Sequence, residues 1–361
     1  MQLQKGGVFA EILDQPRAWK ETLQMLIKRR DELLAWLKGE NFGQVLYMGT
    51  GSSYPIAVSA ASITQLVSGL NTVALPSCEM LYLRRPPYDS RIKTLVIVLS
   101  RSGESDDTIW AVEKLKKLHA TCKVIGITAK EGRLDALCDQ KVLLPRCMEE
   151  GHLATRTPSS MLLTTMVLTS WISNKEVFIN ELVKVADLFT DPAYLKLLQD
   201  QARKLSVPKP LPVHFTFLGT GPYLGLAMEG ARKIREMTQI PAEYHSTLEF
   251  RQANFVTLTK DSMVINLVSD TMRRGELDVL GGLAKFHAGR VSILEATDDY
   301  AKMRSDHIIE LKSKVSEVSR VLLMFPVLHL LCFYMSIAKG KNPERLMHLE
   351  HKILIKDRPG V

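Results

Sequence analysis

The sequence is poor in cysteine and lacks the patterns in which cysteine holds a metal or a disulfide. Its five cysteines are Cys78, Cys122, Cys138, Cys147 and Cys332, and no two of them form a CxxC pair. Such scattered thiols are typical of reduced residues in a cytoplasmic protein and exclude a small disulfide-stapled domain. Residues 1–16 also lack the apolar stretch of a signal peptide, so we expect a cytoplasmic location.

A clear membrane-spanning stretch is absent as well, although residues 321–338 come close to one. This segment, VLLMFPVLHLLCFYMSIA, is barely long enough to cross a bilayer, and Pro326 and His329 lie in its middle. A helix buried between a sheet and a neighbouring layer explains the segment better. We therefore expect no membrane partner.

A stripe of basic residues with interleaved aromatics is also missing. The net charge is +8 at pH 7, but lysine and arginine are scattered in small groups such as residues 28–30, 114–117 and 273–274. This distribution argues against a nucleic-acid surface and fits a protein that handles small anionic metabolites.

Short apolar runs alternate with helical patterns along the chain. Residues 8–38 predict two helices that break near residues 14–16, with Pro16 in the first turn of the second helix. Strands are predicted at residues 44–48, 72–75, 94–99 and 123–127, with helices at 55–68 and 108–118. Apolar strands separated by helices indicate a parallel sheet covered on both faces, which is the doubly wound α/β class.

The same alternation returns about 170 residues later, which is the spacing of an internal repeat. Residues 213–218 (VHFTFL), 263–268 (MVINLV) and 290–294 (RVSIL) echo the strands at 44–48, 94–99 and 123–127. Three matches at one offset predict two tandem doubly wound parallel-sheet domains, at residues 41–173 and 211–340. Helices at 1–40, a helical linker at 174–210 and a tail at 341–361 complete the predicted organisation.

Two hydroxyl-rich loops follow neighbouring strands of the first copy. They are Thr50-Gly51-Ser52-Ser53 and Ser100-Arg101-Ser102-Gly103-Glu104-Ser105. Both precede helices, so their N–H groups, hydroxyls and helix N-termini offer donors to an anion at the carboxyl edge of the sheet. Ser and Gly also form ordinary turns and caps, but two such loops at adjacent strand ends favour a phosphate site.

A nucleotide site is not predicted at these loops. Tyr54 stands where a dinucleotide-binding loop needs its third glycine, and a Walker lysine is absent. We expect no cofactor.

Several segments carry a resemblance to a known family. Residues 48–54, 99–108 (LSRSGESDDT) and 150–157 (EGHLATRT) look like the signature segments of SIS (sugar isomerase) domains. Residues 11–16, 228–236 (MEGARKIRE) and 241–254 extend the match over nearly the whole chain. The pattern resembles the isomerase half of glucosamine-6-phosphate synthase and its stand-alone relatives, which are deaminases, isomerases and deglycases of sugar phosphates.

The resemblance implies a phosphate site in the first copy and a sugar beside it. The matching positions are Thr50, Gly51, Ser52, Ser53, Ser100, Arg101, Ser102 and Ser105 for the phosphate, and Ala154 and Thr155 along the sugar. In the second copy, Gly221-Pro222-Tyr223 and Ser269-Asp270-Thr271-Met272 replace these loops, and Asp270 would repel a phosphate.

Glu236 and Lys233 match the catalytic groups of the family. Glu236 falls at the base that moves a proton between C1 and C2, and Lys233 falls one helical turn earlier, where the family keeps a lysine. Aldose–ketose interconversion needs such a carboxylate, and polar or cationic groups that stabilise the enolic intermediate. Without the resemblance, the two residues form an i,i+3 pair typical of a solvated salt bridge.

Two departures from the family concern ring opening and the tail. Gln252 replaces a histidine to which the family assigns ring opening, and glutamine can orient a proton but not transfer it. His245 is a nearby alternative, or an ordinary packed or surface histidine. In the tail, the position of the family's active-site lysine falls on His351, or on Lys352 after a one-residue slip. His348 and His351 lack a third ligand, so no metal site is expected.

The best prediction of function is an isomerase or deaminase of a hexose or amino-hexose 6-phosphate. Glucosamine 6-phosphate, converted to fructose 6-phosphate and ammonia, is the preferred substrate. No glutamine-hydrolysing domain is expected, and the partners are a small anionic sugar and, as in related proteins, a second copy of the chain. Arg101 and Gln252 leave open the same chemistry on another terminal anion such as a sulfonate. A non-catalytic sugar-phosphate sensor is a further alternative.

Overall fold

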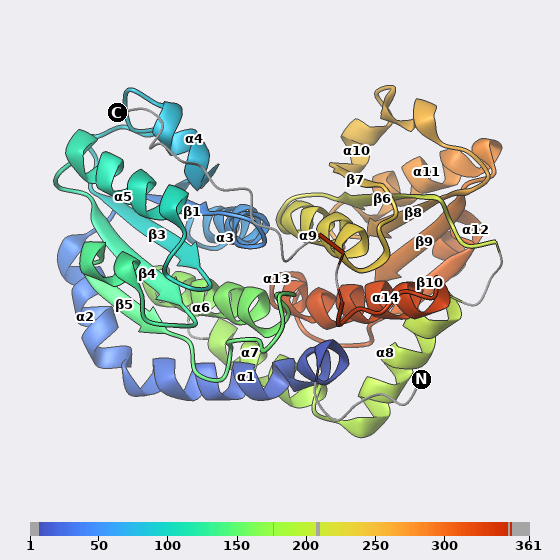
Figure 1. The fold of residues 1–361 in the computed structure, drawn as a ribbon, viewed down its shortest axis with the longest axis horizontal. Helices are drawn as coiled ribbons and strands as arrows, with labels where there is room; N and C mark the ends of the chain where they lie inside the picture. The colour runs from blue at the N-terminus through green and yellow to red at the C-terminus, as the bar shows by residue number, and fades with distance from the viewer. Residues whose placement is uncertain (1–6, 176, 207–209, 346, 349–361) are drawn as a thin grey trace. The chain divides into compact units, whose positions relative to one another are not determined.

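The chain forms two compact units, each built around one five-stranded parallel sheet (Figure 1). The structure is a computed structural model that describes residues 7–175, 177–206, 210–345 and 347–348 of the 361. The first unit holds Arg17–Glu150 and Ala154–Val183, and the second holds the other described residues. The prediction of an α/β protein with two parallel sheets is confirmed.

The sheet of the first unit has the strand order β2-β1-β3-β4-β5, with all neighbours parallel. Its strands are β1 (Gln44–Gly49), β2 (Asn71–Pro76), β3 (Thr94–Ser100), β4 (Lys123–Thr128) and β5 (Gln140–Leu143). Every residue of β1 and β3 is buried, because helices cover both faces.

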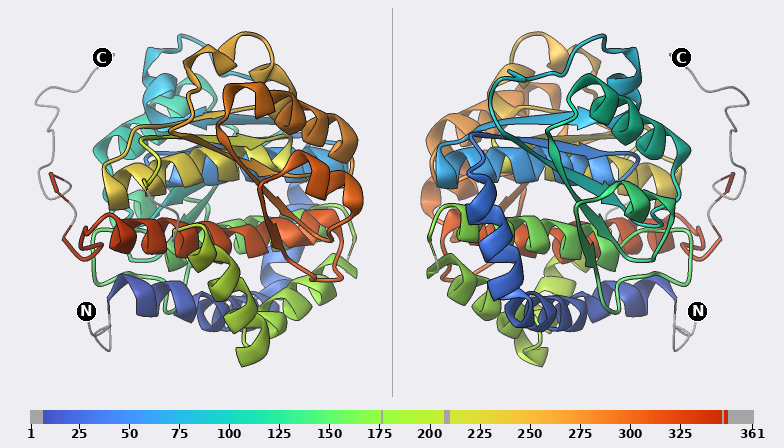
Figure 2. Two further views of the ribbon diagram at one scale, coloured as in Figure 1. Left: turned by 90° about the vertical axis from the view of Figure 1, so that its right-hand side faces the viewer. Right: turned by 90° about the vertical axis from the view of Figure 1, so that its left-hand side faces the viewer.

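Helices α3 (Ser53–Ser68) and α6 (Arg156–Ile172) pack together on one face, and α3 contacts β1 and β2. Helices α4 (Ser77–Tyr82) and α5 (Asp106–Leu118), with the short turn η1 (Arg133–Leu137), cover the other face of the sheet. There they pack on every second residue of the strands. The right-hand view of Figure 2 shows α5 lying over this sheet.

The second unit repeats this strand order, since β7-β6-β8-β9-β10 corresponds to β2-β1-β3-β4-β5. Its strands are β6 (His214–Gly219), β7 (Ala242–His245), β8 (Ser262–Leu267), β9 (Gly289–Leu294) and β10 (His307–Glu310). Helix α9 (Pro222–Thr238) packs on β6 and β7, while α10 (Thr247–Phe250) and α11 (Arg273–Gly282) lie over the opposite face. The repeat in the sequence is therefore a repeat in topology.

The remaining helices connect and cover these sheets. They are α1 (Val8–Lys28), α2 (Arg30–Glu40), α7 (Val177–Leu188), α8 (Pro192–Lys204), α12 (Asp299–Arg304), α13 (Glu317–Arg320) and α14 (Met324–Ala338), with 3-10 turns η2 (Asn254–Thr257), η3 (Leu283–Phe286) and η4 (Val321–Leu323).

The predicted helix break at residues 14–16 is wrong, because α1 runs through Pro16 without interruption. Proline lacks the N–H that would bond the Ile12 carbonyl one turn earlier. In the structure, the Gln15 side-chain Nε2 donates to that carbonyl at 3.0 Å. A neighbouring side chain thus supplies the missing hydrogen bond, and the chain breaks instead at Arg29, between α1 and α2.

The apolar segment that ends at Ala338 is a buried helix, as predicted. Residues Glu317–Ala338 are long and apolar enough to cross a membrane, but 83% of their most apolar window is buried inside the protein. Pro326 lies in the first turn of α14, where its missing N–H breaks no helical hydrogen bond. Helix α14 packs against α8 and α9.

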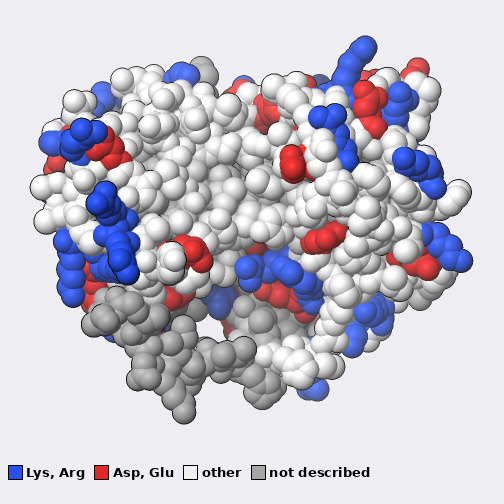
Figure 3. Space-filling view, turned by 90° about the horizontal axis from the view of Figure 1, so that it is seen from above, with Lys and Arg blue, Asp and Glu red and all other residues white. Residues whose placement is uncertain are grey.

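Charged side chains do not gather by sign on the face drawn in Figure 3. Lysine and arginine stand in small groups there, mixed with aspartate and glutamate. This distribution agrees with the scatter of basic residues in the sequence.

Candidate functional site

The two predicted anion loops lie next to each other in the first unit. Strands β1 and β3 pair with Gly49 opposite Leu99, so the loops that follow them leave the same edge of the sheet. The Thr50 hydroxyl donates to Asp107 Oδ2 at 2.7 Å, and Asp107 lies in the first turn of α5, directly after the second loop. The Thr50 side chain therefore braces the two loops.

The first loop turns tightly into α3. Gly51 has φ +63°, and a Cβ on Gly49 would lie 2.7 Å from the backbone of Ser53, so both positions need glycine. The first turn of α3 holds no acidic residue, and Ser52 at its N-cap makes no side-chain cap. The positive end of the helix dipole is therefore available to an anion. Ser53 is buried, with its hydroxyl 3.9 Å from Met161 Sδ.

The second loop keeps its hydroxyl protons available as donors. Ser100 Oγ accepts the Gly103 N–H and Ser102 Oγ accepts the Glu104 N–H, both at 3.2 Å. A hydroxyl that accepts one hydrogen bond still carries a proton to donate. Ser105 lies at the N-cap of α5, where its side chain makes no cap hydrogen bond. These serines suit a ligand with acceptor oxygens.

The acidic residue of this loop is paired with an arginine. Glu104 pairs with Arg133 at 2.7 Å, and this arginine hydrogen bond lowers the pKa of Glu104. Arg133 also bonds Asp106 at 2.6 Å. Gly103, at φ +66°, would bring a Cβ within 3.2 Å of Gly132 Cα, so the loop packs closely on the Arg133 segment.

A third segment joins the loops through Glu149, which the sequence analysis missed. Glu149 Oε1 accepts the N–H groups of Thr155 and Thr157 at 2.8 Å each, at the start of α6. Arg101 Nη1 lies 3.6 Å from Glu149 Oε2. The buried carboxylate therefore holds Arg101 and the predicted sugar segment in one network.

Ala154 and Thr155, which the resemblance places along the sugar, lie at the start of α6. Ala154 is half-buried, and Thr155 is fully buried at the N-cap of the helix. Thr155 Oγ1 has no hydrogen-bond partner among the described residues. Buried polar atoms are nearly always satisfied, so this hydroxyl has capacity for a further bond.

Lys233 and Glu236 belong to the second unit, on α9. Lys233 Nζ donates to Glu236 Oε2 at 2.7 Å and lies 3.3 Å from Glu229 Oε1, a carboxylate that the sequence analysis also missed. Lys233 and Glu229 are both 1% exposed, and Glu236 is 17% exposed. The pair is therefore not a solvated salt bridge.

The two carboxylates keep Lys233 charged. Burial by itself lowers the pKa of this lysine, but the charges of Glu229 and Glu236 outweigh the burial and raise its pKa above the usual value. Lys233 is thus an ammonium at neutral pH, which can donate a proton or stabilise negative charge. The partly exposed Glu236 carboxylate is the member of the trio that solvent can reach.

The remaining predicted positions lie elsewhere or beyond the described residues. Gln252 is exposed, and its backbone N–H donates to the Glu249 carbonyl at 2.9 Å. His245 lies 3.4 Å from Glu243 and packs on Phe250. His351 falls outside the described residues, so its role stays a prediction. Among the described residues, no cluster of His, Cys, Asp or Glu is suited to hold a metal.

The corresponding edge of the second sheet is filled by the protein's own carboxylates. Glu276 Oε2 accepts the Ser269 N–H at 2.7 Å. Glu317 accepts the N–H groups of Asp270 and Thr271, at 2.9 and 3.3 Å, and the Thr271 hydroxyl at 2.9 Å. These donors are therefore already engaged.

Asp270 at this edge is neutralised by a buried arginine. Arg320, which is buried, donates to both Asp270 oxygens at 2.9 and 2.8 Å, and its Nε lies 2.9 Å from Glu295. Arg320 thus offsets the charge through which Asp270 was expected to repel a phosphate, and the expectation that only the first copy keeps an anion site stays a prediction.

Comparison with known proteins gives one family and several relatives. Residues 40–171 match the family model of the SIS domain. Over 349 residues, the chain is 25% identical to the isomerizing glutamine–fructose-6-phosphate aminotransferase of Sulfurisphaera tokodaii. That match covers 96% of this chain and 56% of the relative, so the chain spans little more than half the length of this curated protein.

Two solved structures resemble the fold over nearly its whole length. Tagatose-6-phosphate ketose/aldose isomerase from Escherichia coli matches with a TM-score of 0.83 and 22% identity, over 93% of this chain and 95% of that one. Glucosamine-6-phosphate deaminase from Thermotoga maritima matches with a TM-score of 0.75 and 25% identity, over 96% and 99% of the two chains.

Proposed function

We propose that this chain is a sugar-phosphate isomerase or deaminase built from two tandem SIS domains, since residues 40–171 match the family model of the SIS domain. The preferred reaction converts glucosamine 6-phosphate and water into fructose 6-phosphate and ammonia. The named activities of its relatives include aminotransfer, deamination and ketose–aldose isomerisation of hexose 6-phosphates. A proton transfer between C1 and C2 is the step that such reactions share.

The first unit would bind the phosphate. The hydroxyls of Ser100, Ser102 and Ser105 and the N-terminus of α3 supply donors, and Arg101 adds a positive charge. Glu149 fixes Arg101 and the start of α6, so these groups are preorganised before the ligand arrives. Preorganised donors lose little conformational entropy on binding.

Glu236 would transfer the proton in the open-chain sugar. It removes the proton from C2 of the aminoaldose and returns it to C1, which gives a ketimine. Water then adds to C2 of the ketimine, and ammonia leaves. Lys233, an ammonium at neutral pH, stabilises the negative charge that develops on the enolic intermediate.

The observation that best supports catalysis is the buried trio of Glu229, Lys233 and Glu236. A protein that only senses a sugar phosphate has no need of a buried ammonium next to a partly exposed carboxylate. Burying charges costs free energy unless the pairing is good, so such groups mark functional sites.

Turnover with defined substrates tests this proposal. The purified chain is incubated with glucosamine 6-phosphate, and ammonia and fructose 6-phosphate are measured. We expect both products in equal amounts, and at least a hundredfold lower kcat in Glu236→Gln, about the lower end of a general-base contribution. Binding without turnover would exclude glucosamine 6-phosphate as the substrate. Undiminished turnover in Glu236→Gln would exclude Glu236 as the base.

A second candidate replaces the phosphate by a terminal sulfonate. Its support is the Arg101–Glu149 ion pair, which reduces the net positive charge offered to the anion and so favours a monoanion over a dianion. Competition between a 6-sulfonated and a 6-phosphorylated hexose at the same concentration separates the two. Preferential binding of the sulfonate would show that the natural ligand carries a sulfonate and not a phosphate.

We further propose a cytoplasmic homodimer that uses no organic cofactor. Proton transfer by side chains requires no cofactor. Light scattering coupled to size-exclusion chromatography tests the dimer.

A further inference from the structure

A groove of about 580 Å³ lies in the second unit between α10 and α11. All of its lining lies between residues 248 and 286, so this unit alone forms the groove. Its volume lies in the range of small-molecule sites, roughly 300–1,000 Å³. The apolar part of the lining is Leu248, Phe255, Val279, Leu283 and Phe286.

Two stacked phenylalanines give the groove an aromatic floor. The ring centroids of Phe255 and Phe286 lie 5.2 Å apart, with an interplanar angle of 27°. Both rings also pack against the core of the second unit, which includes Phe250 and Leu280. Because the core holds the two rings in place before a ligand arrives, a flat apolar ring can stack on them or meet their edges at little entropic cost.

Two cationic residues flank this floor. Lys285 Nζ lies 5.1 Å from the ring centroid of Phe286 and 5.9 Å from that of Phe255. Arg251 lines the same groove, and both residues are exposed. Among the described residues, no carboxylate forms an ion pair with either of them. An ammonium that rests on a ring face still presents N–H donors to an anion.

One carboxylate also lines the groove, and it has partners of its own. The Tyr300 hydroxyl donates to Asp278 Oδ1, and Arg304 Nη2 lies 3.6 Å from the same oxygen. Neither Tyr300 nor Arg304 is part of the lining. Because these partners offset the charge of Asp278, Arg251 and Lys285 leave the groove with an excess of positive charge.

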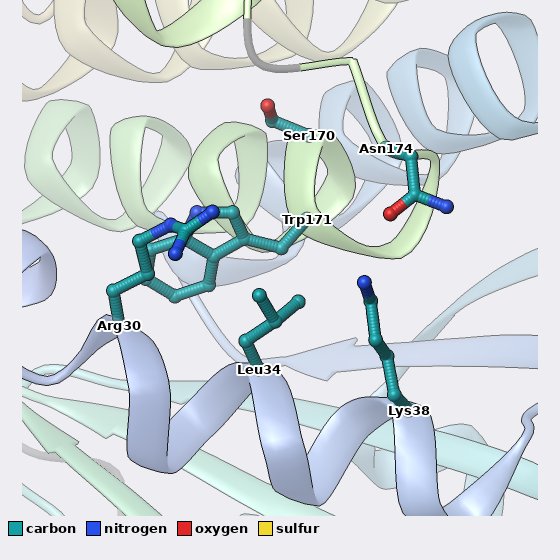
Figure 4. Close-up of a pocket in the computed structure, with 6 residues that line it drawn as sticks. All are labelled: Arg30, Leu34, Lys38, Ser170, Trp171 and Asn174. Carbon is teal, nitrogen blue, oxygen red and sulfur yellow. The ribbon is translucent and has the colours of Figure 1, made fainter.

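The smaller cavity drawn in Figure 4 lacks this combination. It has a volume of about 320 Å³ and lies in the first unit, between α2 and the C-terminal end of α6. Arg30 in its lining lies 3.4 Å from Asp31, and Lys38 stands beside the carbonyl end of α6, which disfavours an anion. The groove of the second unit is therefore better suited to a charged ligand.

The groove lies on the opposite face of the second sheet from the proposed catalytic residues on α9. Phe217 of β6 faces α9, since a Cβ on Gly230 of that helix would lie 2.6 Å from its ring. The next residue, Leu218, belongs to the core beneath the groove. Successive strand residues point to opposite faces, so the sheet separates the groove from α9.

We propose that this groove binds a small aromatic anion, which is a flat ring that carries a carboxylate, phosphate or sulfonate group. The ring packs on Phe255 and Phe286, while Arg251 and Lys285 pair with the anionic group. A neutral aromatic molecule would leave the two cations unused, and an inorganic anion would leave the apolar floor in contact with water. The site does not depend on the isomerase activity proposed above.

A variant that fills the groove tests its location. The probe is 8-anilinonaphthalene-1-sulfonate, an aromatic anion whose fluorescence rises on binding, titrated into the full chain. A Cβ on Gly282 of the lining would meet no atom within 4 Å, so Gly282→Leu should fold and project into the groove, and thermal melting checks the fold. We expect it to weaken binding of the probe at least about fivefold, equivalent to ~1 kcal/mol. Gly39→Leu, the same change at an exposed α2 glycine with equally open surroundings, should leave binding unchanged.

Charge variants test whether the site recognises the anionic group. Arg251→Gln and Lys285→Gln should each weaken binding of the sulfonated probe at least about threefold. Neither should change binding of N-phenyl-1-naphthylamine, which has the same rings without the sulfonate. Lys117→Gln, at an exposed lysine of α5, should affect neither probe. Equal binding of the sulfonated probe in Gly282→Leu and Gly39→Leu, or cation variants that change the two probes alike, would overturn the proposal.

Discussion

Replacing Lys233 by methionine should strongly destabilise the second unit. The variant keeps Glu229, which is 1% exposed, and removes the ammonium 3.3 Å from its Oε1. Removing one member of a buried ion pair costs about 3–5 kcal/mol, because the other charge stays buried after losing its partner in that pair. In a domain of this size, each kcal/mol lowers the melting temperature by about 2–4 °C, so we expect a drop of at least about 6 °C.

The pH dependence of this effect has a definite sign. Without Lys233, the carboxyl group of Glu229 is costly to bury only while it is charged. The penalty is therefore larger at the higher pH, and it shrinks as the pH falls and the carboxyl group becomes neutral. Differential scanning calorimetry at pH 7.5 and pH 5 measures both the size and the direction of the change.

Two control variants isolate the buried charge. Glu229→Gln/Lys233→Met removes both charges and should recover most of the lost stability. Lys302→Met disrupts an i,i+3 pair with Asp299 whose side chains are 63% and 93% exposed, and it should cost less than about 1 kcal/mol. A Lys233→Met protein that melts within a degree of the wild type would refute the reasoning.

Three further predictions concern the anion loops and the core of the second unit. Gly103→Ala should weaken sugar-phosphate binding and lower the stability of the fold by about 1–2 kcal/mol, because φ is +66° and Gly132 lies close. Calorimetric titration measures the affinity and thermal melting measures the stability. Unchanged affinity would contradict this prediction. Glu149→Gln should raise KM for the sugar phosphate more than it lowers kcat, because the contacts that position Arg101 and Thr155 weaken. A change in kcat alone would count against a positioning role for Glu149. Burial, with a smaller contribution from Lys233, holds the pKa of His329 well below 6.5, so below pH 6.5 the unfolded chain binds one more proton than the folded chain. The free energy of unfolding therefore falls by about 1.4 kcal/mol per pH unit below pH 6.5. His329→Gln should flatten this slope, and an unchanged slope would exclude His329 as its source.

The central strands were predictable because burial leaves a plain apolar signal. Residues 94–99 and 263–268 were predicted as strands, and β3 and β8 lie there within one residue. The edge strands β5, β7 and β10 were missed because four residues with polar neighbours carry no such signal. The break at Pro16 was mispredicted because a side-chain bond from Gln15 replaces the missing N–H.

The site residues were predictable only where the groups that act together are neighbours in the sequence. Consecutive hydroxyls such as Ser52-Ser53 indicate an anion loop from sequence alone. Glu149 and Glu317 were missed because a carboxylate that accepts backbone N–H groups from another segment has no distinguishing neighbours. Glu229 had a weak signal, since it lies four residues before Lys233 on one helix face.

Deuterium exchange tests the role of Glu236 directly. Fructose 6-phosphate is incubated with the protein and ammonium in D₂O, so that the ketimine can form, and NMR follows the two hydrogens on C1. If Glu236 moves a proton between C1 and C2 of a phosphate-bound sugar, the wild type replaces one C1 hydrogen by deuterium and Glu236→Gln does not. Exchange that continues at the wild-type rate in Glu236→Gln, or no exchange in a wild type that binds the sugar phosphate, would contradict the account.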